Sequence, residues 1–360
     1  MEGGEAFQDS SQRRTIRVEI ELGLDTFGDV TVDDDGSTPS HARVIRDVVE
    51  EGVLADQLGV DFFGVGEHHR PDFAVSAPDV VLAAIAGQST RIHLGSAVTV
   101  LSTDDPVRVF QRFSTLDAVS NGRAEIILGR GSFTESFPLF GYRLEDYNRL
   151  FEEKLDLFVK LMREQPVTWS GQSYHRLTDQ RVYPDPQQPL KAWIAVGGSP
   201  DSVVRAARHG IPLTLAIIGG QPARFKPLVE LYHRALEEFG HPALPVAVHS
   251  PGYIADTDEQ ARDELWPHFY SMMARIGRER GWPPMSRPQF DATAGPDGAY
   301  FVGAPDTVAE KIVRVARDLG LSRFDMKYSA GTLPHANLMR SIELYGTKVI
   351  PLVREELQRT

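Results

Sequence analysis

Two patterns of hydrophobic and polar positions alternate along the chain. Short apolar or strictly alternating runs are typical of strands, and between them apolar residues recur every three or four positions, as in helices with one buried face. The runs predict strands at 15–24, 60–65, 92–101, 123–128, 191–196, 213–218, 246–255 and 323–328. The helical spacing predicts helices at 41–58, 77–88, 105–119, 146–163, from Ser199 onward, and at 222–239, 305–319 and 334–357, with a break near Gly346.

This alternation predicts a parallel sheet with helical crossovers, and eight strands match a closed (β/α)₈ barrel. By length alone, 360 residues fit one large domain or two medium ones. An open doubly wound sheet is the alternative, but no Gly-x-Gly-x-x-Gly turn follows the first strand. We therefore expect a disordered tail over 1–14 and a single barrel domain over 15–360, an α/β TIM barrel. Its insertions, at about 165–190 and 256–303, are expected at the C-terminal face.

Composition narrows the classes of partner. The chain is 41% hydrophobic and carries a net charge of −12, which argues against nucleic acid and anionic membranes as partners. It has no cysteine, so disulfides, thiolate metal sites and cysteine nucleophiles are excluded. No apolar run is long enough to span a membrane, and the first residues lack the apolar core of a signal peptide. These features predict a cytoplasmic protein.

The stretch 60–70, VDFFGVGEHHR, changes from a buried strand to titratable residues at its end. In an α/β barrel, the ends of the strands are where chemistry is found. Alternation along the strand places Gly64, Gly66 and His68 on one face, which leaves room for something flat with an imidazole above it. Taken alone, the stretch also fits a strand that packs against helices and ends in a polar loop.

Other strand ends also carry small residues, at 95–97, 129–131 and 197–199. In a barrel, all of them face the same mouth. Gly197-Gly198-Ser199, before a helix, offers free backbone N–H groups that suit a phosphate, although Ser199 also fits a plain N-cap. The guanidinium of Arg130 can donate two hydrogen bonds to a phosphate, although a lone arginine at a strand end is commonly a surface residue.

The sequence lacks the motifs that are typical of several other kinds of functional site. Adjacent histidines on an extended chain point in opposite directions, and no spaced set of ligands accompanies His68 and His69, so we expect no metal. No Gly-x-Ser-x-Gly elbow indicates a serine hydrolase. No P-loop and no nicotinamide fingerprint is present, so any redox chemistry needs electrons delivered by another route.

Several stretches in order together resemble the bacterial luciferase-like family of flavin-dependent monooxygenases, whose fold is a (β/α)₈ barrel. They include LADQLGVDFFGVGEHHR, STRIHLGSAVTVLSTDDPVRV, LDAVSNGRAEIILGRGSF, WIAVGGSPDSVVRAARHG and FVGAPDTVAEKI. The resemblance covers most of the chain; only the tail and the segment 255–300 fall outside it. Because several independent motifs match in the right order, the match is far more specific than one glycine pattern.

The resemblance implies an FMN across the mouth of the barrel. His68 matches the catalytic histidine of the family, which is expected to move a proton during breakdown of the flavin hydroperoxide; imidazole suits this role near neutral pH. Ala97–Val98 matches a non-prolyl cis peptide bond under the flavin ring, and Gly129 matches a position that is cysteine in some relatives. The residues implied to bind the cofactor are Gly66, Ala97, Val98, Gly129, Arg130, Gly131, Gly197, Gly198, Ser199, Ser202, Ile217 and Ile218.

Within this set, the phosphate is expected on Gly198, Ser199 and Ser202 with Arg130 as its charged partner, while Ile217 and Ile218 line the ring. Glu67 and His69 are left as supporting or structural residues. The segment 165–190 and the bulky residues Trp266, Tyr270, Met272 and Met273 are candidates for the lid and substrate pocket, although the bulky residues also fit ordinary helix packing.

The resemblance further implies a two-component system. A separate NAD(P)H:flavin reductase supplies reduced FMN, and the protein uses it with O₂ to oxidise a small organic substrate such as an aldehyde or ketone. A homodimer through the early helices is expected. Two alternatives remain, a deazaflavin-dependent oxidoreductase and a non-catalytic flavin-binding partner subunit; His68 argues against the second, which would not need an imidazole there.

Overall fold

The computed structural model describes residues 20–33, 35–131, 133–172 and 174–359, and its core is a closed barrel of eight parallel strands. The predicted tail, 1–14, and the beginning of the first predicted strand lie outside the described residues. The barrel closes because β1 pairs with both β2 and β11, and β8 pairs with β9. The predicted (β/α)₈ fold is confirmed. The strands are β1 (Glu21–Thr26), β2 (Phe62–Val65), β3 (His93–Val100), β4 (Ala124–Gly129), β7 (Lys191–Val196), β8 (Leu213–Ala216), β9 (Val246–Ile254) and β11 (Arg323–Lys327).

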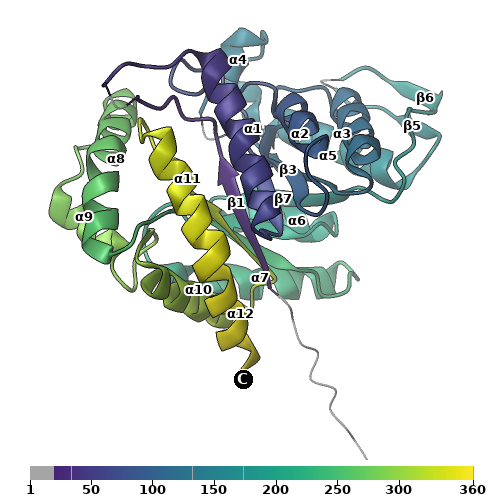
Figure 1. Cartoon of the computed structure of the whole chain (residues 1–360). Helices are drawn as coiled ribbons and strands as arrows, with labels where there is room; N and C mark the ends of the chain where they lie inside the picture. Colours follow the sequence, from purple (N-terminus) through teal and green to yellow (C-terminus); the bar gives the residue numbers. More distant parts are fainter. Residues whose placement is uncertain (1–19, 34, 132, 173, 360) are drawn as a thin grey trace, which may run out of the picture.

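Helices surround the barrel, and Figure 1 shows α1, α11 and α12 in front of β1. Helix α10 illustrates why they form: it begins with Pro305 in its first turn, where no hydrogen bond is lost, and ends at Gly320 with φ +63°. Its buried residues recur at helical spacing: Val308, Ile312, Val315, Ala316 and Leu319. The other main helices around the barrel are α1 (His41–Gln57), α2 (Pro78–Ala86), α3 (Pro106–Ser120), α5 (Tyr147–Arg163), α6 (Pro200–Arg208), α7 (Lys226–Glu238) and, after the last strand, α11 (His335–Leu344).

Some short elements escaped the sequence patterns. These are α4 (Ser136–Leu139), the 3₁₀ turn η1 (Leu144–Asp146) and β10 (Phe301–Gly303), which pairs with the end of β9. The predicted helix 222–239 begins with a 3₁₀ turn, η2 (Pro222–Phe225), before α7. The predicted break near Gly346 is a π-helical turn, η3 (Tyr345–Val349), before α12 (Ile350–Gln358). Gly346 packs against Leu58 so closely that a Cβ there would lie 2.6 Å from the Leu58 Cβ.

The segment 165–190 contains an antiparallel hairpin, β5 (Val167–Trp169) with β6 (Leu177–Gln180). It connects the end of α5 to the beginning of β7, so it is attached at the N-terminal end of the barrel, whereas we expected both insertions at the C-terminal face. Its loop still reaches the beginning of α3, where the Tyr174 hydroxyl donates to Asp105 Oδ1 at 2.7 Å. The attachment was predicted wrongly because it depends on whether an insertion follows a strand or a helix. Figure 1 shows the hairpin on the opposite side of the molecule from α8 (Asp258–Arg280) and α9 (Arg287–Ala294), which follow β9.

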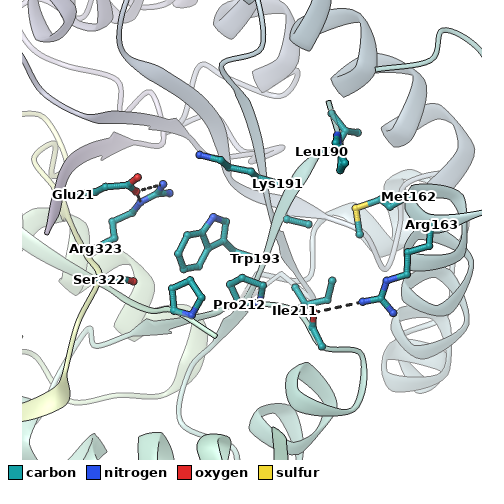
Figure 2. Close-up of a pocket in the computed structure, with 14 residues that line it drawn as sticks. Glu21, Met162, Arg163, Leu190, Lys191, Trp193, Ile211, Pro212, Ser322 and Arg323 are labelled. Atoms are coloured by element: carbon teal, nitrogen blue, oxygen red, sulfur yellow. Dashed lines mark hydrogen bonds and ion pairs between the residues drawn. The ribbon is translucent and has the colours of Figure 1, made fainter. Parts of the chain in front are cut away.

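The N-terminal end of the barrel holds a pocket of about 480 Å³, lined by Trp193, Lys191, Pro212 and neighbouring residues (Figure 2). Beside it, the Arg323 guanidinium lies 4.4 Å from the Phe62 ring centroid and 4.7 Å from that of Trp193. Arg323 also pairs with Glu21 and, at 2.8 Å, with the fully buried Glu125. Burial alone would raise the pKa of Glu125, but the Arg323 charge holds that pKa far below its usual value. A charged, packed layer thus fills this end of the barrel interior.

Within the described ranges, no helix is long and apolar enough to cross a membrane.

Candidate active site

The opposite, C-terminal end of the barrel opens into a cavity of about 580 Å³. Every barrel strand, or the loop that follows it, contributes a residue to its wall, and α8 covers one side. The lining residues predicted from sequence are His68, Ala97, Val98, Gly129, Arg130, Gly131, Gly197 and Ile218. Gly66, Gly198, Ser199 and Ser202 lie beside this lining without forming part of it, and Ile217 is separate from it.

His68 follows β2 and is 9% exposed. Its backbone N–H donates to the Val75 carbonyl at 3.1 Å, and its ring centroid lies 4.5 Å from that of Phe73. The rings of Phe27 and Phe133 complete an apolar enclosure, at 4.8 Å and 5.1 Å. The imidazole is therefore held in a fixed position with little access to bulk water.

Glu135, which sequence reasoning missed, is the acidic partner of His68. Its Oε1 lies 3.4 Å from the Nδ1 of His68. Burial raises the pKa of Glu135, but hydrogen bonds from His68 and from backbone N–H groups outweigh that effect and lower it below its usual value. Glu135 belongs to a loop after β4 that has no strong pattern, so only the structure reveals the pair.

Glu67 and His69 have structural contacts. Oε1 of Glu67 lies 2.9 Å from Nε2 of His69, and its Oε2 accepts a hydrogen bond from the Val100 backbone N–H at 2.9 Å. Glu67 thereby ties the loop after β2 to the end of β3. Glu67 thus supports the loop that carries His68, in line with the expectation that Glu67 is a supporting or structural residue.

The glycines of β2 do not leave open room for a flat ligand, which corrects our expectation. A Cβ on Gly64 would lie 2.8 Å from the Cβ of Ala97, and a Cβ on Gly66 would overlap the Phe27 ring. Protein atoms already occupy that space. On β4, a Cβ on Gly129 would lie 2.6 Å from a methyl of Val98, so this glycine also permits close packing.

The Ala97–Val98 peptide bond is cis, as the resemblance implied. Both residues line the cavity from β3. Ala97 packs with Ile127 and Ala195 in the barrel interior. This part of the wall is therefore small and apolar.

A cationic corner lies where β4 meets the beginning of α6. Ser202 Oγ accepts hydrogen bonds from Arg130 and Arg205, each at 3.1 Å, and Arg130 also donates to Asn148 Oδ1 at 2.8 Å. Gly198, with φ +112°, adopts a conformation that other residues rarely adopt. The Ser199 side chain makes no capping hydrogen bond, so the plain N-cap alternative is not realised. Arg205 is also paired with Glu152, so the Arg130 guanidinium and the helix N-terminus are the features that suit a phosphate group.

The wall formed by α8 is mostly apolar. Its cavity-lining residues are Phe269, Met272, Met273 and Ile276, with Arg280 at the end of the helix and Trp282 just beyond it. Trp266 and Tyr270 do not line the cavity: Trp266 packs on Phe290 at 5.2 Å between ring centroids, and Tyr270 is 40% exposed. Of the four bulky residues, Trp266 and Tyr270 thus belong to ordinary helix packing.

Ile217 and Ile218 separate because β8 ends at Ala216, two residues earlier than predicted. Ile217 is fully buried in the hydrophobic core, and its N–H donates to the His249 carbonyl at 2.8 Å. Ile218 points the other way, is 61% exposed and lines the cavity. Only Ile218 is positioned to touch a bound molecule.

A latch of ionic and aromatic contacts joins three segments around the mouth. Arg70, after β2, donates two hydrogen bonds to Glu279 on α8, at 2.8 and 2.6 Å. The Phe133 ring, from the loop after β4, lies between the guanidinium groups of Arg70 and Arg280, at 4.8 and 4.9 Å. We call Arg70, Phe133, Glu279 and Arg280 the latch. It fastens the end of α8 over the cavity.

Three further cavity residues, Asp25, His249 and Asp325, were not singled out in the sequence. They lie on β1, β9 and β11, and in β1 (ELGLDT) and β11 (RFDMK) charged residues alternate with apolar ones. Buried parallel strands are usually near-continuous apolar runs. The alternation, which places one set of charged residues inside the barrel, is the signal that sequence reasoning missed.

Comparison with known proteins gives a consistent picture. The family model for luciferase-like monooxygenases matches residues 26–323. The alkanal monooxygenase alpha chain of Photobacterium leiognathi is 26% identical over 345 residues, 88% of this chain and 95% of that one. An F420-dependent glucose-6-phosphate dehydrogenase of Amycolatopsis mediterranei is 29% identical over 161 residues, 42% of this chain and 48% of that one.

Solved structures show the same fold. Monooxygenase RslO1 from Streptomyces bottropensis superposes with a TM-score of 0.79 at 22% identity, covering 92% of this chain and 99% of that one. The oxygenating constituent of 3,6-diketocamphane monooxygenase from Pseudomonas putida, in complex with FMN, superposes with a TM-score of 0.71 at 21% identity, covering 92% and 98%. With a family model that matches most of its length, this chain belongs to the luciferase-like monooxygenase family of flavin-dependent oxidoreductases.

Proposed function

We propose that the protein is the oxygenating component of a two-component FMN-dependent monooxygenase, which uses reduced FMN and O₂ to oxidise an aldehyde or ketone-like substrate. The observation that carries this proposal is the cavity itself. It connects a corner suited to a phosphate, around Arg130 and α6, with an enclosed imidazole, His68. A phosphate-bearing cofactor held at the corner therefore has room to extend toward the histidine.

In this proposal, Arg130, Ser202 and the first N–H groups of α6 hold the phosphate of FMN. Val98, Gly129 and Ile218 supply apolar surface for the ring. The reduced flavin, when bound, supplies the electrons that activate dioxygen. His68 gives or takes a proton at its ring nitrogen, and Glu135 keeps the imidazole oriented through Nδ1.

The apolar wall of α8 has two proposed roles. Phe269, Met272 and Met273 would pack against the apolar body of the substrate. The latch, by holding α8 in place, would keep water away from the reacting groups, which protects reactive intermediates. Segment 165–190 has no part in the proposed lid because none of its described residues lines the cavity.

A second candidate function is deazaflavin-dependent hydride transfer, because F420-dependent enzymes are among the relatives. The cationic corner suits the phosphate of either cofactor. The discriminating measurement is binding of each cofactor to the purified protein. We favour FMN, and tight binding of F420 without binding of FMN would reverse that choice. The remaining alternative, a non-catalytic flavin-binding partner subunit, predicts flavin binding without turnover.

We further propose a separate NAD(P)H:flavin reductase as the source of reduced FMN, a cytoplasmic location and a homodimer through the early helices. Exposed apolar side chains on adjacent helices α2 and α3 support the dimer: Val80 is 64% exposed and Val119 52% exposed. Sedimentation should show a dimer that Val80→Glu weakens, and a concentration-independent monomer would refute it.

The test of the function is an anaerobic titration with reduced FMN, followed by mixing with oxygen and an aldehyde such as decanal. We expect saturable binding of reduced FMN and conversion of the aldehyde to the acid. His68→Ala should bind reduced FMN as the wild type does but lose most of the conversion. Failure of the wild type to bind reduced FMN would refute the proposal, and unchanged conversion by His68→Ala would refute the role of His68.

A further inference from the structure

The pocket at the N-terminal end of the barrel is separate from the candidate active site. None of its described lining residues lines the other cavity. Its volume of about 480 Å³ is within the range that is typical of sites for small molecules. We call it the N-terminal pocket, and most of its lining suits an apolar ligand. The apolar lining residues include Met162, Leu190, Ala192, Trp193, Ile211 and Pro212.

The walls of the N-terminal pocket are fixed by contacts behind them. The hydroxyl of Tyr232, on α7, donates a hydrogen bond to the carbonyl oxygen of Ile211 at 2.7 Å. The indole N–H of Trp193 donates to Oε2 of Glu125 at 3.0 Å. Because Ile211 and Trp193 are held before any ligand arrives, little has to be ordered on binding, and a preformed pocket of this kind favours affinity.

The charged side chains lie mainly at one end of the N-terminal pocket. Figure 2 shows Glu21, Lys191 and Arg323 at this end and Met162 and Leu190 at the other. Glu21 accepts a hydrogen bond from Nε of Arg323 at 2.7 Å, so its negative charge is compensated within the protein. The pocket therefore has a polar end and an apolar end, which suits an amphipathic ligand.

Lys191 is the cation at the polar end that has hydrogen-bond donors to spare. Its Nζ lies 3.4 Å from Oε1 of Glu125, and its side chain is 55% exposed. Glu125 also pairs with Arg323 at 2.8 Å, so its charge stays compensated when the lysine moves. Because a lysine ammonium has three donors, Lys191 can bind a second acceptor inside the pocket.

The N-terminal pocket is also richer in positive than in negative charge. Of its four charged lining residues, Glu21, Arg163, Lys191 and Arg323, three are cations. Arg163 donates to the backbone carbonyl of His209 at 2.5 Å, and none of the described acids forms an ion pair with it. In a chain whose net charge is −12, such a pocket attracts an anion locally.

A carboxylate fits the polar end of the N-terminal pocket better than a phosphate does. A phosphate carries more charge and calls for several charged or backbone donors, as in the cationic corner. At the polar end one ammonium group, that of Lys191, is free to move, and it matches a single carboxylate in charge.

We propose that the N-terminal pocket is a second binding site, for an apolar monocarboxylate. The carboxylate accepts hydrogen bonds from Nζ of Lys191, and the hydrocarbon body lies along Trp193 and Ile211 toward Leu190 and Met162. The site is at the opposite end of the barrel from the proposed chemistry, so it goes beyond the proposed function and requires no flavin. Failure of the protein to bind FMN would refute the proposed function alone.

The ligand class is tested by isothermal titration of the full chain with octanoate. We expect saturable binding, and octanol, which has the same chain length without the charge, should bind about tenfold more weakly because a hydrogen bond between charged groups is lost. Inorganic phosphate and octylammonium should not compete with octanoate. Octanol that binds as tightly as octanoate, or competition by phosphate, would overturn the monocarboxylate class.

The location is tested with crystals soaked in 8-bromooctanoate, because the anomalous scattering of bromine marks the end of the hydrocarbon chain. We expect bromine near Met162 and Leu190 and the carboxylate at Lys191. Bromine in the C-terminal cavity alone, or in neither place, would overturn the proposal.

Variants of Lys191 test the recognised charge. Lys191→Gln should weaken octanoate binding about tenfold and leave octanol binding unchanged, whereas Lys191→Arg, which keeps the charge, should retain octanoate binding. Urea unfolding checks that the half-exposed side chain is not needed for the fold. The matched control is Lys226→Gln, an exposed lysine at the beginning of α7 and outside the pocket, which should bind octanoate as the wild type does. Equal octanoate affinity in Lys191→Gln and wild type would overturn the proposal.

Discussion

The barrel raises the pKa of one buried carboxylic acid, Asp325. Burial, together with neighbouring acids, raises its pKa well above the usual value, although Arg323 opposes the shift. Between the usual pKa and the raised one, the folded protein holds a proton that the unfolded chain has released. Asp325 therefore makes its largest contribution to the free energy of unfolding at low pH, and this contribution falls as the pH rises.

Asp325→Asn should remove this dependence. The stability of the variant relative to wild type should increase from pH 4 to pH 8, by at most about 1.4 kcal/mol for each pH unit. Urea unfolding at several pH values measures it. The control is Asp318→Asn, an exposed acid at the end of α10, which should run parallel to the wild type. A difference independent of pH would contradict a raised pKa of Asp325.

At the residue scale, sequence reasoning selected strand ends that carry an unusual residue. Three residues chosen in this way, His68, Arg130 and Gly197, line the cavity, and their roles remain predictions. Sequence reasoning failed where partners come from distant loops, as with Glu135 opposite His68, because a loop without periodicity does not reveal its path. It also failed for Gly64 and Gly66, since a glycine signals a close approach without identifying the atoms that approach.

At the scale of elements, the beginning of α6 and the end of β4 act together as the cationic corner. Arg130→Lys keeps the charge but loses the planar fork that bonds Ser202 and Asn148. FMN affinity should fall by about tenfold, while riboflavin, which lacks the phosphate, should lose much less. Isothermal titration measures both ligands.

The control for this corner is Arg208→Lys, at the other end of α6, where the arginine pairs with Glu152. It should leave the ratio of FMN to riboflavin affinity unchanged. Equal losses of FMN and riboflavin in Arg130→Lys would place the phosphate elsewhere.

The latch tests whether α8 acts as a cover. Glu279→Gln removes the charge that Arg70 binds with two hydrogen bonds. Exposed ion pairs are worth up to about 1 kcal/mol, so the fold should survive while residues 269–282 exchange amide hydrogens several times faster. Glu343→Gln, which breaks an exposed pair with Arg340, is the control. Unchanged exchange in Glu279→Gln would show that the latch does not restrain α8.

The sequence predicted the helices and strands better than it predicted where each of them lies in the fold. The eight strands and most helices follow from periodicity, since each buries one face. The face on which the hairpin β5–β6 lies does not follow from its own residues, because it depends on the connection to which it belongs. Short elements such as β10 were missed because three residues show no period.

For the whole molecule, Arg323 links three strands through the barrel interior. It reaches Glu21 on β1 and Glu125 on β4 from its position on β11. Arg323→Met would leave Glu125 buried without its main partner, so we expect a loss of about 3–5 kcal/mol of unfolding free energy. The double variant Arg323→Met with Glu125→Gln should recover most of that loss. Additive losses in the double variant, measured by urea unfolding, would contradict the coupling.

The methionines of the α8 wall bear on how long each molecule keeps working. The chain has no thiol to be oxidised, so the soft sulfur nearest the proposed chemistry is that of Met272 and Met273. Oxidant that misses the substrate would convert these thioethers to polar sulfoxides and spoil the apolar wall. Mass spectrometry after many turnovers should find sulfoxide there before it appears at Met162, which lines the pocket at the opposite end (Figure 2). The amount of sulfoxide in each molecule would then record how many of its reactions had failed. The double variant Met272→Leu with Met273→Leu should lose activity more slowly.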